Sequence, residues 1–205
     1  MTRSSSELRV FVVPIMGHWQ RRHEQNGTRV LWRDLRLLCT ADATILEPKR
    51  WNHNWRELAE WIVAEAQGWF RLVTLGYSYG GGWGSQRLTE EVFNESRRKL
   101  KAVETWQALA DPVSRFGFGA RWPLNALNVT RWSGSWRSIE LHRSVKRAWW
   151  CDQREAAPFG QKVRSKLHEA GVEYGGRFEY PHSAMDELPA YHEAATTLVR
   201  EALET

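Results

Sequence analysis

Several features that would assign this chain to a special class are absent from its sequence. No apolar run approaches the roughly 20 residues needed to span a bilayer. The first ten residues, MTRSSSELRV, lack the apolar core of a signal peptide, since Arg9 interrupts the apolar stretch at 8–15. We therefore expect a cytoplasmic protein without a membrane span. It has only two cysteines, Cys39 and Cys151, and a reducing compartment favours separate thiols over a disulfide.

Motifs for metals and nucleotides are also missing. The sequence has no Cys-x-x-Cys and no His-Glu-x-x-His, which argues against a zinc site. The glycines at 80–82 are not followed by Lys and Ser or Thr, and the stretch 76–84 lacks G-x-G-x-x-G spacing. We therefore expect neither a metal nor a nucleotide cofactor.

The charge balance is basic but not patterned. The formal net charge is +5, with lysines and arginines scattered along the chain, so a solvated basic surface explains it better than a nucleic-acid partner. The 13 tryptophans are spread from Trp19 to Trp150, which favours core and rim positions over a stacking platform. Nothing in the sequence sets the oligomeric state.

The length and the order of elements predict one α/β domain. The 205 residues suit a single domain over 1–205, and they contain no repeat. Apolar runs alternate with amphipathic stretches, which predicts a mainly parallel sheet covered on both faces. We expect strands over 8–14, 43–46, 70–75, 100–109, 144–150 and 176–180, and helices over 28–38, 54–66, 78–97 and 184–203. The stretch 114–138 reads as a long loop or lid insertion.

One motif carries chemistry. Gly76 to Gly80 (GYSYG) fits G-x-S-x-G, in which a serine sits on a sharp, strained turn between strand and helix. Larger side chains two residues either side would collide, so glycine is needed there. The pattern alone arises by chance in roughly one chain of fifteen at ordinary composition, and a structural Gly-Ser turn is the alternative. The apolar run FRLVTL before it and the small residues after it favour the chemical interpretation.

The segment LVTLGYSYGGGWG resembles the nucleophile elbow of α/β-hydrolases, especially the lipase and esterase branch with its GxSxGG form. The element order resembles that family from Leu8 to Leu203. The resemblance implies a three-layer α/β/α sandwich of the compact α/β-hydrolase type, and 205 residues leave no room for a large cap. It also implies a serine hydrolase in which Ser78 attacks a small-molecule acyl ester or thioester and forms an acyl-enzyme, with no cofactor.

A serine hydroxyl is a poor nucleophile until a base accepts its proton. In this family the chain order is serine, acid, histidine, so the base must follow Ser78. His182 stands between the last expected strand and the last helix, where α/β-hydrolases carry the base, and Pro181 fixes the local backbone. The other histidines after the serine are His142, His168 and His192.

Three carboxylates compete for the third position, in which an acid orients the imidazole. Asp111 heads an Asp-Pro pair after the strand that follows the elbow helix, as in pancreatic-type lipases, and we favour it. Asp152 and Glu155 follow the next strand, the commoner acid position in the wider fold. Asp111 as a simple Asp-Pro turn remains an alternative. Asp186 is expected in the first turn of the last helix, where its charge suits the helix dipole.

The resemblance also implies an oxyanion hole of two backbone N–H groups. Tyr79, the residue after the nucleophile, supplies one of them. Met16 or Gly17, in the loop after the first strand, supplies the other. The order Gly17-His18 reverses the family's usual His-Gly, and His18 is either a pocket residue or a surface histidine.

The rival from another class is a non-catalytic module that binds a ligand or protein on the same scaffold, because fold does not fix function. A fluorophosphonate probe separates the two hypotheses, since it labels an activated Ser78 and leaves a scaffold serine untouched.

Overall fold

The computed structural model describes residues 8–18, 20, 25–38, 43–113, 138–153, 161–165 and 171–204. Its centre is a seven-stranded sheet in which every strand pairing is parallel. The strand order is β2-β1-β4-β5-β7-β9, and β3 pairs with the end of β1. The strands are β1 (Arg9–Met16), β2 (Ala43–Ile45), β3 (Lys49–Arg50), β4 (Phe70–Tyr77), β5 (Val103–Ala110), β7 (Val145–Gln153) and β9 (Gly171–Phe178). A separate two-stranded sheet joins β6 (Ile139–Leu141) and β8 (Val163–Ser165).

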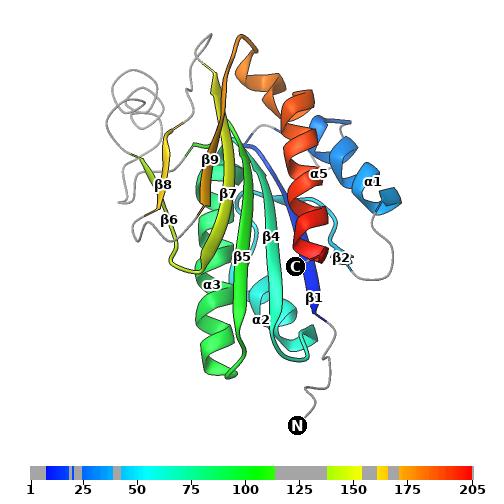
Figure 1. Ribbon diagram of the computed structural model, residues 1–205, viewed down its shortest axis with the longest axis vertical. Coiled ribbons are helices and arrows are strands. Elements are labelled where there is room, and N and C mark those ends of the chain that lie inside the picture. Colours follow the sequence, from blue (N-terminus) through cyan, green and yellow to red (C-terminus); the bar gives the residue numbers. More distant parts are fainter. Residues whose placement is uncertain are drawn as a thin grey trace.

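Helices cover both faces of the central sheet, which confirms the expected three-layer α/β/α sandwich (Figure 1). On one face lie α1 (Gly27–Leu38) and α5 (Pro189–Glu204), and on the other α2 (Trp55–Glu65) and α3 (Ser85–Arg98). Two short helical turns complete the described elements: η1 (Gly80–Gly84), a wide π-type turn, and η2 (His182–Glu187), a 3₁₀ turn.

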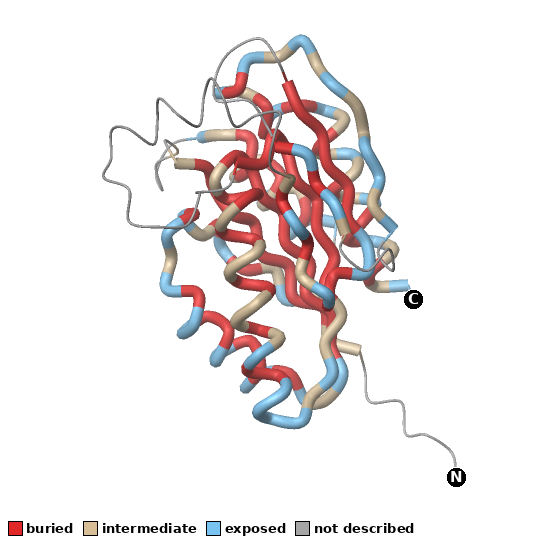
Figure 2. Tube along the Cα trace, turned by 90° about the vertical axis from the view of Figure 1, so that its left-hand side faces the viewer, coloured by how far each residue is buried: buried red, intermediate tan, exposed pale blue. Residues whose placement is uncertain are grey.

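Alternation along β1 shows how the sequence builds the layers. Val10 and Val12 point into the cluster beneath α1 and α5, whereas Phe11 and Val13 point into the cluster beneath α2 and α3. All four are fully buried, which explains why this strand reads as an unbroken apolar run. Figure 2 shows the buried sheet enclosed by helices with exposed outer faces.

The loops that carry the candidate site residues all lie at one edge of the central sheet. Parallel strands share the same carboxyl edge, and the loops after β1, β4, β5 and β9 all emerge there. The chain leaves β1 toward β2 on one side and resumes at β4 on the other, so the space between β1 and β4 is a topological switch point. Such points are where open α/β sheets bind ligands.

Two expectations at the end of the chain were wrong. The last strand is β9, which begins five residues before the expected start at 176. It is an edge strand with little apolar sequence, and Gly175 is required because a Cβ there would lie 2.0 Å from Trp149 Cζ2. The last helix begins at Pro189 rather than 184, because 182–187 form η2 instead.

Other expectations lie outside the described residues. These are the 114–137 part of the loop or lid, Cys39 and the candidate acid Glu155. Cys151 is buried and free, and burial raises the pKa of its thiol to about 12. The strands β3, β6 and β8 were not expected, because two or three residues carry too little periodicity.

Candidate active site

The site begins at the turn between β4 and η1, where Ser78 has a φ of +52°, a left-handed conformation that non-glycine residues rarely adopt. Neighbouring backbone holds it there. The Ser78 N–H donates to the Ala110 carbonyl at 3.0 Å, and the Ser78 carbonyl accepts from the N–H groups of Gly81, Gly82 and Val113 at 2.9 to 3.0 Å. This is the strained elbow that the motif predicts, kept in place by surrounding hydrogen bonds.

The two outer glycines of the motif are required by space. A Cβ on Gly76 would lie 2.5 Å from the Gly81 Cα, and one on Gly80 would lie 2.3 Å from the Ile15 carbonyl oxygen. Both obstacles are backbone atoms, which cannot rotate away. The elbow therefore packs against the end of β1, as the motif requires.

His182 reaches the serine from the far end of the chain. Its Nε2 lies 2.9 Å from Ser78 Oγ. Pro181, in extended conformation with φ −63°, precedes the ring and opens η2. The Tyr77 hydroxyl donates to the His182 carbonyl, which ties the histidine loop to the elbow strand. Burial raises the pKa of Tyr77, and Asp186 and Asp111 raise it further, so Tyr77 remains a proton donor in this contact.

Asp111 completes a chain of three side chains. It follows β5 with a φ of +43°, and its Oδ2 accepts from His182 Nδ1. The same carboxylate accepts from the Gln153 backbone N–H at 3.3 Å and from Gln153 Nε2 at 3.1 Å. An ionised carboxylate can only accept, so Nδ1 carries the ring's proton and Nε2 is left to accept from the Ser78 hydroxyl.

The three side chains are removed from water. Ser78 is 3% exposed, His182 9% and Asp111 0%. Charges interact more strongly in such surroundings than in water. The arrangement can therefore move a proton from the serine hydroxyl to the imidazole and stabilise the resulting positive charge with the aspartate.

The other candidate acids and bases lie elsewhere. The Asp152 carboxylate accepts from the Tyr174 hydroxyl at 2.6 Å and faces Arg177 Nε at 3.6 Å. His142 Nδ1 lies 2.9 Å from Ser144 Oγ before β7, at the opposite edge of the sheet. His192 Nε2 contacts the Asp186 carbonyl at 2.6 Å. His168 lies outside the described residues.

The loop after β1 lies directly against the nucleophile. A Cβ on Gly17 would be 3.2 Å from Ser78 Cβ and 2.7 Å from the Tyr77 ring. The Gly17 N–H donates to Gln20 Oε1 at 2.9 Å in this resting structure. Of the expected oxyanion donors, Tyr79 follows Ser78 in the chain and Gly17 packs against it, but the Gly17 N–H is taken by Gln20, and Met16 is the last residue of β1; their role stays a prediction.

His18 is part of an aromatic cluster beside the nucleophile. Its ring centroid lies 5.0 Å from that of Trp51 and 5.5 Å from that of Tyr79, and the last two rings are 5.6 Å apart. Trp51 is buried, whereas His18 and Tyr79 are partly exposed. The cluster lies next to the elbow, because Tyr79 follows Ser78, and whether His18 lines a pocket stays a prediction.

Sequence reasoning missed several residues that support the site. Gln153 orients Asp111, and no motif distinguishes it from other glutamines. Asp186 was expected to serve its own helix. Its carboxylate instead accepts from the Thr28 N–H at 2.7 Å, in the first turn of α1. Asp186 does lie at the N-terminus of a helix, as the dipole argument expects, but the helix is α1 and not the last one. Only the fold brings η2 next to α1.

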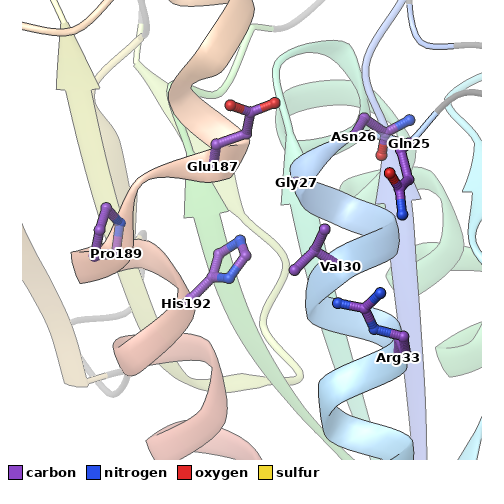
Figure 3. A pocket seen from close by; sticks show the side chains of 8 residues that line it. All are labelled: Gln25, Asn26, Gly27, Val30, Arg33, Glu187, Pro189 and His192. Carbon is purple, nitrogen blue, oxygen red and sulfur yellow. The ribbon is translucent and has the colours of Figure 1, made fainter.

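A pocket of about 720 Å³ lies between the starts of α1 and α5 (Figure 3). Gln25, Arg33 and His192 are among the residues that line it. Ser78, His182 and Asp111 are not among them. No three His, Cys, Asp or Glu side chains gather to hold a metal ion within the described ranges. No helix among the described residues is long and apolar enough to cross a membrane.

Comparison with known proteins adds no family. A scan against protein-family models gives no match, and a search of curated proteins finds no similar sequence. Membership of the α/β-hydrolases therefore stays a prediction from the elbow and the element order.

Proposed function

We propose that this protein is a serine hydrolase that cleaves carboxylic esters or thioesters through an acyl-enzyme on Ser78. The observation that carries the proposal is the chain of contacts from Ser78 Oγ through His182 to Asp111, at the carboxyl edge of a parallel sheet. The three residues come from loops after three different strands. An α/β-hydrolase fold and a cytoplasmic location belong to the same proposal, the latter on the sequence alone.

In the first half of the reaction, Ser78 Oγ attacks the carbonyl carbon of the substrate as its proton passes to His182 Nε2. The carbonyl oxygen becomes negative and is held by backbone N–H groups, from Tyr79 and from the loop after β1. Asp111 stabilises the imidazolium that forms. Collapse of this tetrahedral species breaks the bond to the leaving alcohol or thiol, which takes the proton from Nε2.

In the second half, water replaces the leaving group. His182 takes a proton from water as the oxygen attacks the acyl carbon, and Ser78 Oγ leaves with that proton. The products are a carboxylic acid and free enzyme. Gly76 and Gly80 support both halves, since they let the elbow hold Ser78 at its positive φ against β1.

The test is a panel of p-nitrophenyl esters of increasing acyl length, run on the wild type and on Ser78→Ala. Loss of the nucleophile of such a triad lowers turnover by about a thousandfold or more. A circular dichroism spectrum equal to the wild type's serves as the folding control. Equal turnover by the two proteins would refute the acyl-enzyme, and a wild type inactive on every ester would favour a binding module.

A further inference from the structure

A second hydrogen-bonded bridge lies beside the catalytic side chains. Asp186 belongs to η2, four residues after His182, and its carboxylate is buried. One carboxylate oxygen accepts from the Thr28 N–H at 2.7 Å, from the Thr28 hydroxyl at 3.1 Å and from Gln20 Nε2. Burial raises the pKa of Asp186, and hydrogen bonds from Gln20 and Thr28 offset part of that rise. The bridge thus fixes η2 to the start of α1.

The other end of Gln20 faces the nucleophile. Its Oε1 accepts from the Gly17 N–H at 2.9 Å and lies 3.3 Å from the Thr28 hydroxyl. Gly17 in turn packs against Ser78 and the Tyr77 ring. One side chain therefore joins the loop after β1 to the short helix that carries the base.

The chemistry of the bridge requires an amide at position 20. Its partners are a backbone N–H, which can only donate, and a carboxylate, which accepts. A primary amide carries one acceptor and one donor group at its two ends, and its orientation here is fixed by both partners. A carboxylate at position 20 would face Asp186 with like charge, and an aliphatic side chain would satisfy neither partner.

We propose that Gln20 is a positioning residue of this hydrolase: by accepting from the Gly17 N–H and donating to Asp186 it holds the end of β1, where Met16 is the remaining candidate oxyanion donor, at a fixed place relative to Ser78 and His182. The inference rests on the proposed function. An oxyanion hole is effective because its donors are in place before charge develops on the substrate. Without the bridge, the loop must be ordered at each turnover, which slows the chemical step and leaves ground-state binding nearly unchanged.

The first test is Gln20→Leu, of similar size but without either hydrogen bond. We expect kcat on a p-nitrophenyl ester to fall at least about tenfold, less than the roughly 100-fold or more for outright loss of a donor, with KM changed by less than about threefold. The affinity of a trifluoromethyl ketone, which mimics the tetrahedral species, should fall by the same factor as kcat/KM. The matched control is Gln67→Leu, exposed at the opposite edge before β4.

The second test changes the charge at position 20 and keeps the size of the side chain. Gln20→Glu places two carboxylates together and should lower kcat as much as Gln20→Leu. The carboxylate of Asp186 accepts from Gln20 and from the Thr28 N–H through one and the same oxygen, so an amide at 186 keeps both bonds only with its oxygen in that place. Asp186→Asn is therefore the control: it removes the charge but can keep all three hydrogen bonds, and we expect its kcat to stay within about threefold of the wild type.

The outcomes separate this inference from the proposed function. If Ser78→Ala is inactive while Gln20→Leu keeps kcat within twofold, the positioning role is wrong and the hydrolase stands. Wild-type kcat in Gln20→Glu, with its fold intact by circular dichroism, also overturns the bridge. If Ser78→Ala keeps wild-type turnover, the proposed function itself fails.

Discussion

Replacing Asp111 by asparagine keeps the size of the side chain and removes the charge that faces His182. Oδ2 accepts from both His182 Nδ1 and Gln153 Nε2, and Oδ1 accepts from the Gln153 backbone N–H. The new amide has two placements. If its NH₂ faces the Gln153 backbone N–H, two donors meet in a fully buried place and neither can turn away, at a cost of about 1–3 kcal/mol.

The opposite placement avoids that collision. The asparagine oxygen then keeps the Gln153 backbone N–H, and its NH₂ faces His182 Nδ1. This contact is satisfied only if the imidazole proton moves to Nε2, which then points a donor at Ser78. Such a tautomer costs about four powers of ten in kcat, or about 5.4 kcal/mol of transition-state stabilisation. Even the first placement loses a charge-assisted hydrogen bond to His182. Such a bond contributes about 1.5–3 kcal/mol, and losing that much transition-state stabilisation lowers kcat roughly 10- to 150-fold.

The assay is steady-state hydrolysis of a p-nitrophenyl ester by Asp111→Asn and Asp152→Asn at equal folding. We expect Asp111→Asn to lose at least tenfold and up to about ten-thousandfold in kcat. Asp152→Asn should stay within about threefold, because its carboxylate serves Tyr174 and Arg177. Wild-type activity in Asp111→Asn with a large loss in Asp152→Asn would refute the assignment of the acid.

Three further predictions follow from burial and placement. His182→Ala should abolish ester hydrolysis, whereas His142→Ala, at the other edge of the sheet, should keep most of it; near-normal turnover by His182→Ala would contradict the assigned base. Gly80→Ala should lower the free energy of unfolding, measured in urea, by about 1–3 kcal/mol. The control Gly68→Ala should lower it by less than about 0.5 kcal/mol, because a Cβ at Gly68 would meet nothing within 4 Å. Equal effects of the two substitutions would show that the elbow is not tightly packed. With a thiol pKa of about 12, Cys151 is about one ten-thousandth thiolate at pH 8, so iodoacetamide should modify it only in denaturant, as peptide mapping would reveal.

The elbow and its partners were predictable because their positions follow from local rules. Apolar runs gave the interior strands, and the carboxyl ends of parallel strands must share an edge. Ser78 and Asp111 each follow such a strand, His182 follows the edge strand β9, and the structure brings the three within contact. Their catalytic roles remain a prediction that only chemistry can test.

The supporting residues could not be predicted, because their roles depend on partners distant in sequence. Asp186 lies 158 residues from Thr28, and Gln20 lies 166 residues from Asp186. Both look like ordinary polar loop residues until η2 packs against α1. The start of the edge strand β9 was misplaced because its sequence, GVEYGGRF, has little apolar periodicity, and Gly175 is needed there because Trp149 occupies the space beside it.

Covalent labelling of Ser78 tests the central claim most directly. The wild type and Ser78→Ala would be incubated with a fluorophosphonate probe, and intact mass and peptide mapping would locate the adduct. The account predicts one adduct on Ser78 in the folded wild type and none in Ser78→Ala or in the urea-unfolded wild type, because activation requires His182 at 2.9 Å. A folded wild type that stays unlabelled, or one labelled equally with and without Ser78, would contradict it.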